Sequence, residues 1–373
     1  MSGGVDSSVA AALLKKQGYE VIGVFMKFWS PSYAKASEGK LENICCSLES
    51  STAARAVANK LNIPFYVVNF AKEFKRSVVD YFIKEYEGGR TPNPCVICNR
   101  DIKGEILMKK VMELDGDYLA TGHYARIESG SEISKSKFQI TNKAQNPNFK
   151  LLKSKDKNKD QTYFLWTLTQ EKLAKLLFPV GDLTKSQVRS IAKEMKLPTA
   201  ERRESQGICF IPDGNISMFL RRYAKQLLKP GDILDTAGNR LGAHNGLIDY
   251  TIGQREHLGL GGPRAYYVIK LDCQNNILVV GEEKELYKKS LIATDLSWIT
   301  SANSKRLAAN GTKAKIRYGH PSESCDLEAV GRKQFKVTFT KSQRAITPGQ
   351  SIVFYKRDEV LGGGIISKQI GGN

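Results

Sequence analysis

Two cysteines stand three positions apart in a short loop that contains two prolines. The stretch TPNPCVICNR, residues 91–100, holds Cys95 and Cys98. A CxxC pair can bind zinc or an iron–sulfur cluster, act as a redox dithiol, pack as an inert structural pair, or supply one reactive thiol. A zinc ribbon needs a second CxxC, and the sequence has none. Seven cysteines without secretory context do not predict a disulfide framework.

Cys98 is the stronger candidate of the two for a reactive thiol. It falls just before a predicted helix over residues 101–114, for which Asn99 is a plausible N-cap. Amides at a helix N-terminus and the neighbouring Arg100 would both stabilise a thiolate. The remaining metal-ligand candidates are scattered along the chain: Cys45 and Cys46, which are adjacent, and the isolated His123 and Cys209. No metal site is predicted.

The chain opens with MSGGVDSS and continues directly into a helical pattern. Gly3 and Gly4 lack Cβ atoms, so the backbone can approach a phosphate closely, and serine hydroxyls and helix amides can bind an anion there. The P-loop pattern GxxxxGK[ST] and the dinucleotide pattern GxGxxG are both absent. A glycine-rich turn by itself is more often structural than functional.

Helix and strand patterns alternate up to about residue 200. Helical patterns cover residues 5–18, 50–61, 71–86 and 101–114, and strand patterns cover 20–29, 65–70 and 117–124. Thr184 and Gln187 form a capping-box pattern for a helix that ends near Leu197. This alternation predicts a parallel sheet with helices on both faces.

Beyond about residue 205, short strand patterns alternate with Gly, Asn and Pro turns, with one helical pattern over 215–228. We therefore expect three domains: an α/β domain over residues 1–203, a small, mostly β domain over 204–272, and an antiparallel β-barrel over 273–373. Residues 30–40 and 129–148 have the composition of exposed insertions.

The chain is strongly basic, with 57 Lys and Arg residues against 38 Asp and Glu residues, a net charge of +19. Such a charge attracts polyanions over about a Debye length, roughly 8 Å at physiological salt, which favours RNA or DNA as a partner over a role in solubility alone. No apolar run approaches the roughly 18 residues of a membrane span, and no export or organelle signal is visible. We expect a cytoplasmic protein without a membrane partner.

The combination Ser-Gly-Gly-Val-Asp-Ser at residues 2–7 resembles the pyrophosphate-binding motif of the ATP pyrophosphatase group, whose members cleave ATP to adenylate a carbonyl oxygen. In that group a hydrophobic strand precedes the motif, whereas here the motif opens the sequence. We expect the true start to lie upstream. Loss of the strand would leave unpaired backbone edges in the core, at a cost of about several kcal/mol.

Further motifs extend the resemblance along the whole chain. SGGVDSS is followed, in order, by GRTPNPCVICN, ATGHYAR, KDQTYFL, FPVGDLTKSQVR, SQGICFI, TPGQSIVFY and LGGGII. This series resembles the bacterial type of tRNA-specific 2-thiouridylase. The resemblance implies that ATP activates the C2 oxygen of the wobble uridine of tRNA as an adenylate, and that persulfide sulfur displaces AMP. It also implies an ATP-binding first domain and a final barrel that binds tRNA.

By this resemblance Cys209 carries the persulfide, delivered by a sulfur-relay protein or a cysteine desulfurase. Cys98 is the second catalytic thiol, and a transient Cys98–Cys209 disulfide completes the transfer. A persulfide is a strong sulfur nucleophile, so the chemistry is reasonable once the carbonyl oxygen has been converted into a leaving group. Mg²⁺ is expected with ATP, and the protein is expected to be a monomer.

The same resemblance assigns the other site residues. Those that would bind ATP are Met1, Ser2, Gly3, Gly4, Val5, Asp6, Ser7, Met26 and Gly122. Those that would meet the target base are Asn93, Pro94 and Cys95. Those that would contact tRNA are His123, Lys159, Asp160, Gln161, Arg317, Tyr318 and Gln350. Some family members carry an acid in the place of Cys95. A thiol titrates roughly four pH units above a carboxyl group, so an acid–base role does not carry over to Cys95.

Two alternatives stay open at this point. One is a different ATP-dependent adenylating enzyme that shares only the first domain, such as a 4-thiouridine synthase or an amidating synthetase. The C-terminal motifs and the pair Cys98 and Cys209 argue against it. The other is a non-catalytic RNA-binding relative, which the absence of a first strand would allow.

Overall fold

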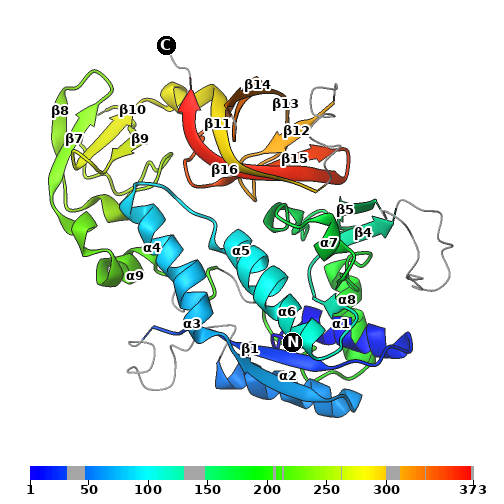
Figure 1. The fold of residues 1–373 in the computed structure, drawn as a ribbon. Helices are drawn as coiled ribbons and strands as arrows, with labels where there is room; N and C mark the ends of the chain where they lie inside the picture. The colour runs from blue at the N-terminus through cyan, green and yellow to red at the C-terminus, as the bar shows by residue number, and fades with distance from the viewer. Residues whose placement is uncertain are drawn as a thin grey trace.

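The computed structural model describes residues 1–31, 47–129, 148–204, 207–211, 214–261, 263–299, 311–331 and 333–370. Cys45 and Cys46 lie outside these ranges, as do most of the two expected insertions. In Figure 1 an α/β region forms the lower part of the molecule, and two β regions lie above it. No helix within the described ranges is long and apolar enough to cross a membrane.

The α/β region contains two pairs of parallel strands. β1 (Gly23–Lys27) pairs with β2 (Phe65–Asn69), and β3 (Leu119–Ala120) pairs with β6 (Leu176–Leu177). Its helical segments are α1 (Val5–Lys16), α2 (Leu48–Leu61), α3 (Ala71–Phe74), η2 (Lys75–Val79), α4 (Asp80–Glu87), α5 (Pro94–Ile97), η3 (Cys98–Leu107), α6 (Met108–Glu113), η4 (Thr162–Phe164), α7 (Gln170–Leu173) and α8 (Lys185–Glu194). Helix α2 lies on one side of β1 and β2, and α3 to α6 lie on the other (Figure 1). The predicted parallel strands with helices on both faces are confirmed.

Helices α1 and α8 pack together and position the glycine-rich turn that precedes α1. Val9 of α1 and both Val188 and Ala192 of α8 are fully buried in one hydrophobic cluster. Burial of a valine side chain contributes about 1.5–3 kcal/mol. The predicted capping box is confirmed, because the Thr184 hydroxyl accepts from the Gln187 amide and the Gln187 side chain accepts from the Thr184 amide at 2.8 Å. The start of α8 is thereby fixed beside the start of α1.

The helix after the proline-rich loop begins earlier than predicted. It starts at Pro94 with Asn93 as its N-cap residue, and it continues from α5 through the π-helical segment η3 into α6. Proline is favoured at the first position of a helix because its fixed φ suits that site. The expectation that Asn99 caps this helix is wrong, since Asn99 lies inside the helix and is buried. Cys98 is therefore also internal to the helix, and the first-turn amides lie nearer to Cys95.

The middle region is a four-stranded sheet in the order β8-β7-β10-β9. Its segments are α9 (Ile216–Tyr223), η5 (Lys225–Leu228), β7 (Gly231–Asp235), β8 (Arg240–His244), η6 (Leu247–Asp249), β9 (Tyr267–Asp272) and β10 (Ile277–Gly281). The side chain of Asn215 caps α9 by accepting from the Met218 amide at 2.8 Å. β9 and β10 pair antiparallel, so this sheet crosses the expected domain boundary after Asp272 and continues to Gly281.

Six strands close into an antiparallel barrel in the order β11-β14-β13-β12-β15-β16, because β16 pairs back onto β11. A short 3-10 segment, η7 (Glu283–Leu286), leads into it, and the strands are β11 (Tyr287–Trp298), β12 (Lys313–Lys315), β13 (Glu323–Gly331), β14 (Gln334–Arg344), β15 (Ser351–Lys356) and β16 (Glu359–Ile370). Leu291, Val337 and Phe354 are fully buried inside it. The hairpin of β4 (Ala125–Ser129) and β5 (Phe149–Lys153), which belongs to the α/β region, extends the barrel sheet because β5 pairs with β16. The expected antiparallel barrel is confirmed.

Candidate active site

The glycine-rich turn at residues 1–4 is closed by its own serine hydroxyls. The Ser7 hydroxyl accepts from the Ser2 amide at 3.1 Å, and the Ser8 hydroxyl donates to the Gly4 carbonyl at 2.9 Å. Gly3 adopts φ +75°, a conformation that favours glycine. Gly122, at the end of β3, lies against this turn, because a Cβ there would stand 2.7 Å from the Ser7 nitrogen. The structure thus brings together the opening motif and Gly122.

A lysine that the sequence reasoning missed stands beside the opening turn. Lys185, the first residue of α8, places its ammonium 2.7 Å from Asp6 Oδ1 and 3.2 Å from Glu204 Oε1. The Tyr124 hydroxyl donates to Asp6 at 2.7 Å. Lys185 belongs to the motif FPVGDLTKSQVR. Neither spacing nor composition shows that it would contact Asp6, which lies 179 positions earlier in the chain.

An arginine that the sequence reasoning also missed contacts the same turn. Arg202 donates to the Gly3 carbonyl at 3.0 Å and to the Ser50 hydroxyl at 2.9 Å. The turn therefore has two cations beside it, Arg202 and Lys185. Backbone amides of a glycine-rich turn, a helix N-terminus and two cations fit the phosphates of a nucleotide.

The carboxylate of Glu204 lies close to three cations. Its oxygens lie 2.7 Å from Lys159, 3.2 Å from Lys185 and 3.8 Å from Arg189. The hydrogen bond from Lys159 is the main cause that lowers the pKa of Glu204, and Lys185 adds to it. Glu204 thereby links Lys159, an expected tRNA contact, to the turn expected to bind ATP.

The three cysteines of the predicted site differ in exposure. Cys95 is exposed on the first turn of α5, Cys98 is buried, and Cys209 is partly buried. Cys98 belongs to the buried hydrophobic cluster that also contains Phe210, and Cys209 packs against that cluster. Two thiols that are 111 positions apart in sequence therefore border one core. Met26, on β1, is partly buried and packs against the same cluster.

A short polar chain connects the Cys98 helix to the end of β3. Lys103 donates to Asn99 Oδ1 at 2.9 Å, and its ammonium lies 3.4 Å from His123 Nε2. The other ring nitrogen of His123 lies 2.7 Å from the Thr121 hydroxyl. Removal of the ring from water, together with the Lys103 charge, lowers the pKa of His123 well below its usual range. His123 is therefore neutral at physiological pH.

The loop expected to meet the target base is held by the barrel. The Thr91 amide donates to the Pro348 carbonyl at 2.9 Å, and the Gln350 side chain donates to the Thr91 carbonyl at 2.9 Å. Asn93 hydrogen-bonds with Tyr163, whose hydroxyl also donates to a barrel carbonyl. Gln350 and Asn93, both predicted site residues, thus meet at one junction.

The remaining expected tRNA contacts divide into exposed and internal groups. Tyr318 is 38% exposed, and its ring lies 4.6 Å from that of Phe164. Arg317 donates to the Ala345 carbonyl at 3.0 Å. Asp160 is buried and accepts from the Ser154 amide at 3.1 Å. Gln161 accepts from the Tyr124 amide at 3.0 Å. Lys159 and Tyr318 are therefore the members best placed to meet a ligand from solvent.

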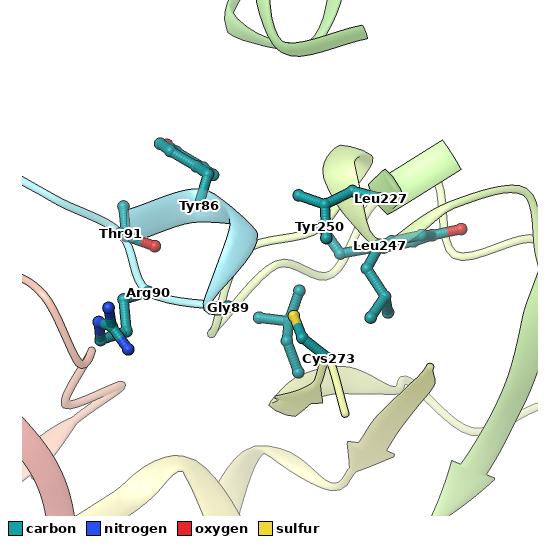
Figure 2. Close-up of a pocket in the computed structure, with 9 residues that line it drawn as sticks. Tyr86, Gly89, Arg90, Thr91, Leu227, Leu247, Tyr250 and Cys273 are labelled. Atoms are coloured by element: carbon teal, nitrogen blue, oxygen red, sulfur yellow. The ribbon is translucent and has the colours of Figure 1, made fainter. Parts of the chain in front are cut away.

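The same loop meets the middle region on its other side, where it encloses a small pocket. Figure 2 shows Cys273 beside Gly89, with Arg90 and Thr91 next along the loop. A Cβ at Gly89 would stand 2.8 Å from the Cys273 sulfur, so a side chain does not fit there. The cavity volume is about 10 Å³, room for roughly one water. The pocket lies between the α/β region and the middle region. Among the described residues no group of three or more His, Cys, Asp or Glu side chains is arranged to hold a metal ion.

Comparison with known proteins identifies the family. Three family models match in order: the tRNA methyl transferase HUP domain over residues 1–213, the tRNA methyl transferase PRC-barrel domain over 217–282, and the Aminomethyltransferase beta-barrel domain over 288–366. The tRNA-specific 2-thiouridylase MnmA of Geobacter metallireducens is 47% identical over 98% of this chain and 95% of its own length. Those of Symbiobacterium thermophilum and Carboxydothermus hydrogenoformans are 48% and 46% identical, each over 99% of this chain and over 91% and 97% of their own lengths. With its signature turn, its helix-borne thiol and its barrel, this chain belongs to the tRNA-specific 2-thiouridylase family.

Proposed function

We propose that this protein is an ATP-dependent tRNA-uridine 2-sulfurtransferase that forms 2-thiouridine at the wobble position. The observation that carries the proposal is the position of the two half-sites. The glycine-rich turn at residues 2–7 packs against Gly122, and the helix that bears Cys98 contacts the neighbouring His123 through Lys103. The activity named for relatives of nearly equal length supports the same reaction.

The first step is adenylation of the target uridine, with ATP as substrate. The uridine O2 attacks the α-phosphorus, the α–β bridging bond breaks, and pyrophosphate leaves with the bonding electrons. The uridine N3 proton is released, so the adenylate is neutral at the base. Residues 2–7, Lys185 and Arg202 would bind the leaving phosphates. Mg²⁺ would accompany ATP in the usual way.

The second step transfers sulfur. The terminal sulfur of a Cys209 persulfide attacks C2, and the C2–O bond breaks as AMP departs. The Cys98 thiolate then attacks Cys209 Sγ, and the bond to the transferred sulfur breaks with its electrons remaining on that sulfur. N3 regains a proton, 2-thiouridine is released, and a Cys98–Cys209 disulfide remains for a dithiol reductant to reduce.

Partners and location follow from this chemistry. A sulfur-relay protein or a cysteine desulfurase would supply the persulfide, and the barrel with Lys159 and Tyr318 would contact tRNA phosphate and bases. The target base must leave its stack to reach the thiols. We propose that the protein acts in the cytoplasm as a monomer.

The reaction is tested by incubating unmodified tRNA with the purified protein, ATP and a persulfide donor, followed by nucleoside analysis. The expected products are 2-thiouridine, AMP and pyrophosphate, with no thiolation when ATP is omitted. 4-Thiouridine, or adenylation without thiolation, would instead support the alternative adenylating enzymes. Absence of any modified nucleoside together with tight tRNA binding would support a non-catalytic relative.

A further inference from the structure

Lys103 is a partly buried lysine that the proposed mechanism has not yet used. Its ammonium donates to Asn99 Oδ1 at 2.9 Å and lies 3.4 Å from His123 Nε2. Within the described part of the chain, no carboxylate comes within 4.0 Å of this ammonium. Lys185 differs, because it stands between the carboxylates of Asp6 and Glu204. Lys103 therefore has no salt-bridge partner among the described carboxylates.

The neighbours of Lys103 hold it in position without supplying a negative charge. The Asn99 side chain donates to the Phe164 carbonyl at 3.1 Å, which turns its oxygen towards Lys103. His123 is neutral and is itself held by Thr121. A cation kept between two neutral dipoles keeps most of its attraction for an incoming anion.

Lys103 also lies between the two halves of the site. It follows Cys98 by five positions within η3, one turn of a π-helix. Its charge also helps burial to lower the pKa of the Met1 amine at the opening turn and that of His123, which follows β3. In α/β sheets, ligands bind outside the carboxyl ends of strands, and Lys103 lies at that edge of β3. An anionic group that joins the phosphate turn to the thiol helix would pass this ammonium.

We propose that Lys103 is a further catalytic residue, whose ammonium binds the α-phosphoryl group of the nucleotide in both the adenylation step and the departure of AMP. This inference rests on the proposed function. The α-phosphoryl group is the part of ATP that remains attached to the base after pyrophosphate leaves. A cation fixed beside it would stabilise the charge that develops there in each step. Asn99 and His123 are then positioning residues for Lys103.

The test compares nucleotide binding by Lys103→Met, Lys103→Arg and a control, Lys109→Met, in the absence of tRNA. Lys109 follows in α6, and its side chain is 80% exposed. Calorimetry would measure binding of AMP and of inorganic pyrophosphate separately. Lys103→Met should weaken AMP binding about 10- to 100-fold, the worth of one charge-assisted hydrogen bond, and should leave pyrophosphate binding unchanged. Lys103→Arg should restore much of the AMP affinity, and Lys109→Met should change neither.

Other outcomes overturn the inference. Equal weakening of AMP and pyrophosphate binding would place Lys103 in a general electrostatic role, and unchanged AMP affinity would show that Lys103 does not bind the α-phosphoryl group. Because binding is measured without tRNA, a failure of thiolation does not affect this result. A folding control is the imidazole titration of His123 by NMR: in a folded Lys103→Met variant the loss of the nearby charge should raise the pKa of His123. If Lys103→Met does not fold, Lys103→Gln, which can still donate to Asn99, replaces it.

Discussion

The side chain of Gln350, beside strand β15 of the barrel, donates a hydrogen bond to the carbonyl of Thr91, three residues before the helix that bears Cys95 and Cys98. A second hydrogen bond, from the Thr91 amide to the Pro348 carbonyl, completes the pairing. The barrel thus contacts the backbone of the loop that precedes Cys95 and Cys98. If tRNA binds the barrel as proposed, it binds the region that holds this loop in place.

The contact between Gly349 and Thr91 can be tested by adding one methyl group. Gly349 has φ +89°, and a Cβ there would stand 2.9 Å from the Thr91 nitrogen. Gly349→Ala should therefore displace the loop and lower kcat for thiolation roughly 10-fold or more, because catalysis is sensitive to small misplacements. Gly238→Ala is the matched control, since Gly238 has φ +91° with nothing within 4 Å.

The positive φ should cost both alanine variants about 1–2 kcal/mol in the free energy of unfolding, and Gly349→Ala should lose more because its Cβ also meets the Thr91 backbone. Urea denaturation would measure this shared cost, and single-turnover thiolation would measure the difference in rate. If the two variants had equal kcat, the loop would not depend on its contact with the barrel.

The proposed sulfur chemistry predicts unequal roles for three cysteines. Cys98→Ser and Cys209→Ser should each abolish formation of 2-thiouridine, because one thiol carries the sulfur and the other releases it. Cys95→Ser should keep substantial activity. Nucleoside analysis of treated tRNA would measure all three. Equal loss in all three variants would point to a shared metal or dithiol site at Cys95 and Cys98.

Lys185 is expected to act on the nucleotide. Lys185→Met should raise KM for ATP about 10-fold, because the variant lacks a cation beside the phosphate turn. Lys193→Met, on the same helix, is the control, since the Lys193 side chain is 60% exposed and contacts only the exposed Glu201 among the described carboxylates. ATP titration of the initial rate gives KM. Matching changes in the two variants would mean that only the charge of α8 matters.

His123 should make the protein less stable in mild acid. Its pKa is lowered in the folded state, so below about pH 6.5 the unfolded chain binds a proton that the folded chain excludes. Stability should therefore fall as the pH drops from 7.5 to 5.5. His123→Gln, which cannot bind that proton, should lose less stability over the same range. Thermal unfolding at a series of pH values would show this, and parallel curves for the two proteins would contradict it.

Most of the architecture could be predicted from local pattern. Short-range sequence patterns predict the alternating helices and strands, the capping box at Thr184 and the antiparallel barrel. The structure confirms all three. The start of the helix at Pro94 was missed because Asn99, a favoured cap residue, lies in the same stretch. Its buried amide instead makes a tertiary hydrogen bond to Phe164, 65 positions away, which local patterns do not reveal.

Motifs could name candidate site residues, which stay predictions, but they could not show which other side chains packing brings beside them. The resemblance supplied the opening turn, Cys98 and Cys209, but Lys185, Arg202 and Glu204 reach the turn only through tertiary structure. The contact between Lys185 and Asp6 depends on how α8 packs against α1. The sequence alone does not show how close these two side chains lie.

The ladder between β5 and β16 has a consequence for how this protein can be divided. Leu151 and Leu152 of the α/β region pair with Val360 and Glu359 of the barrel, so one sheet crosses from the first region into the last. A fragment that ended before β11 would lack β16, and β5 would then have an unpaired strand edge, which favours aggregation. The barrel is therefore not a detachable module. A chimaera that exchanges barrels between relatives should include the β4–β5 hairpin as part of the graft.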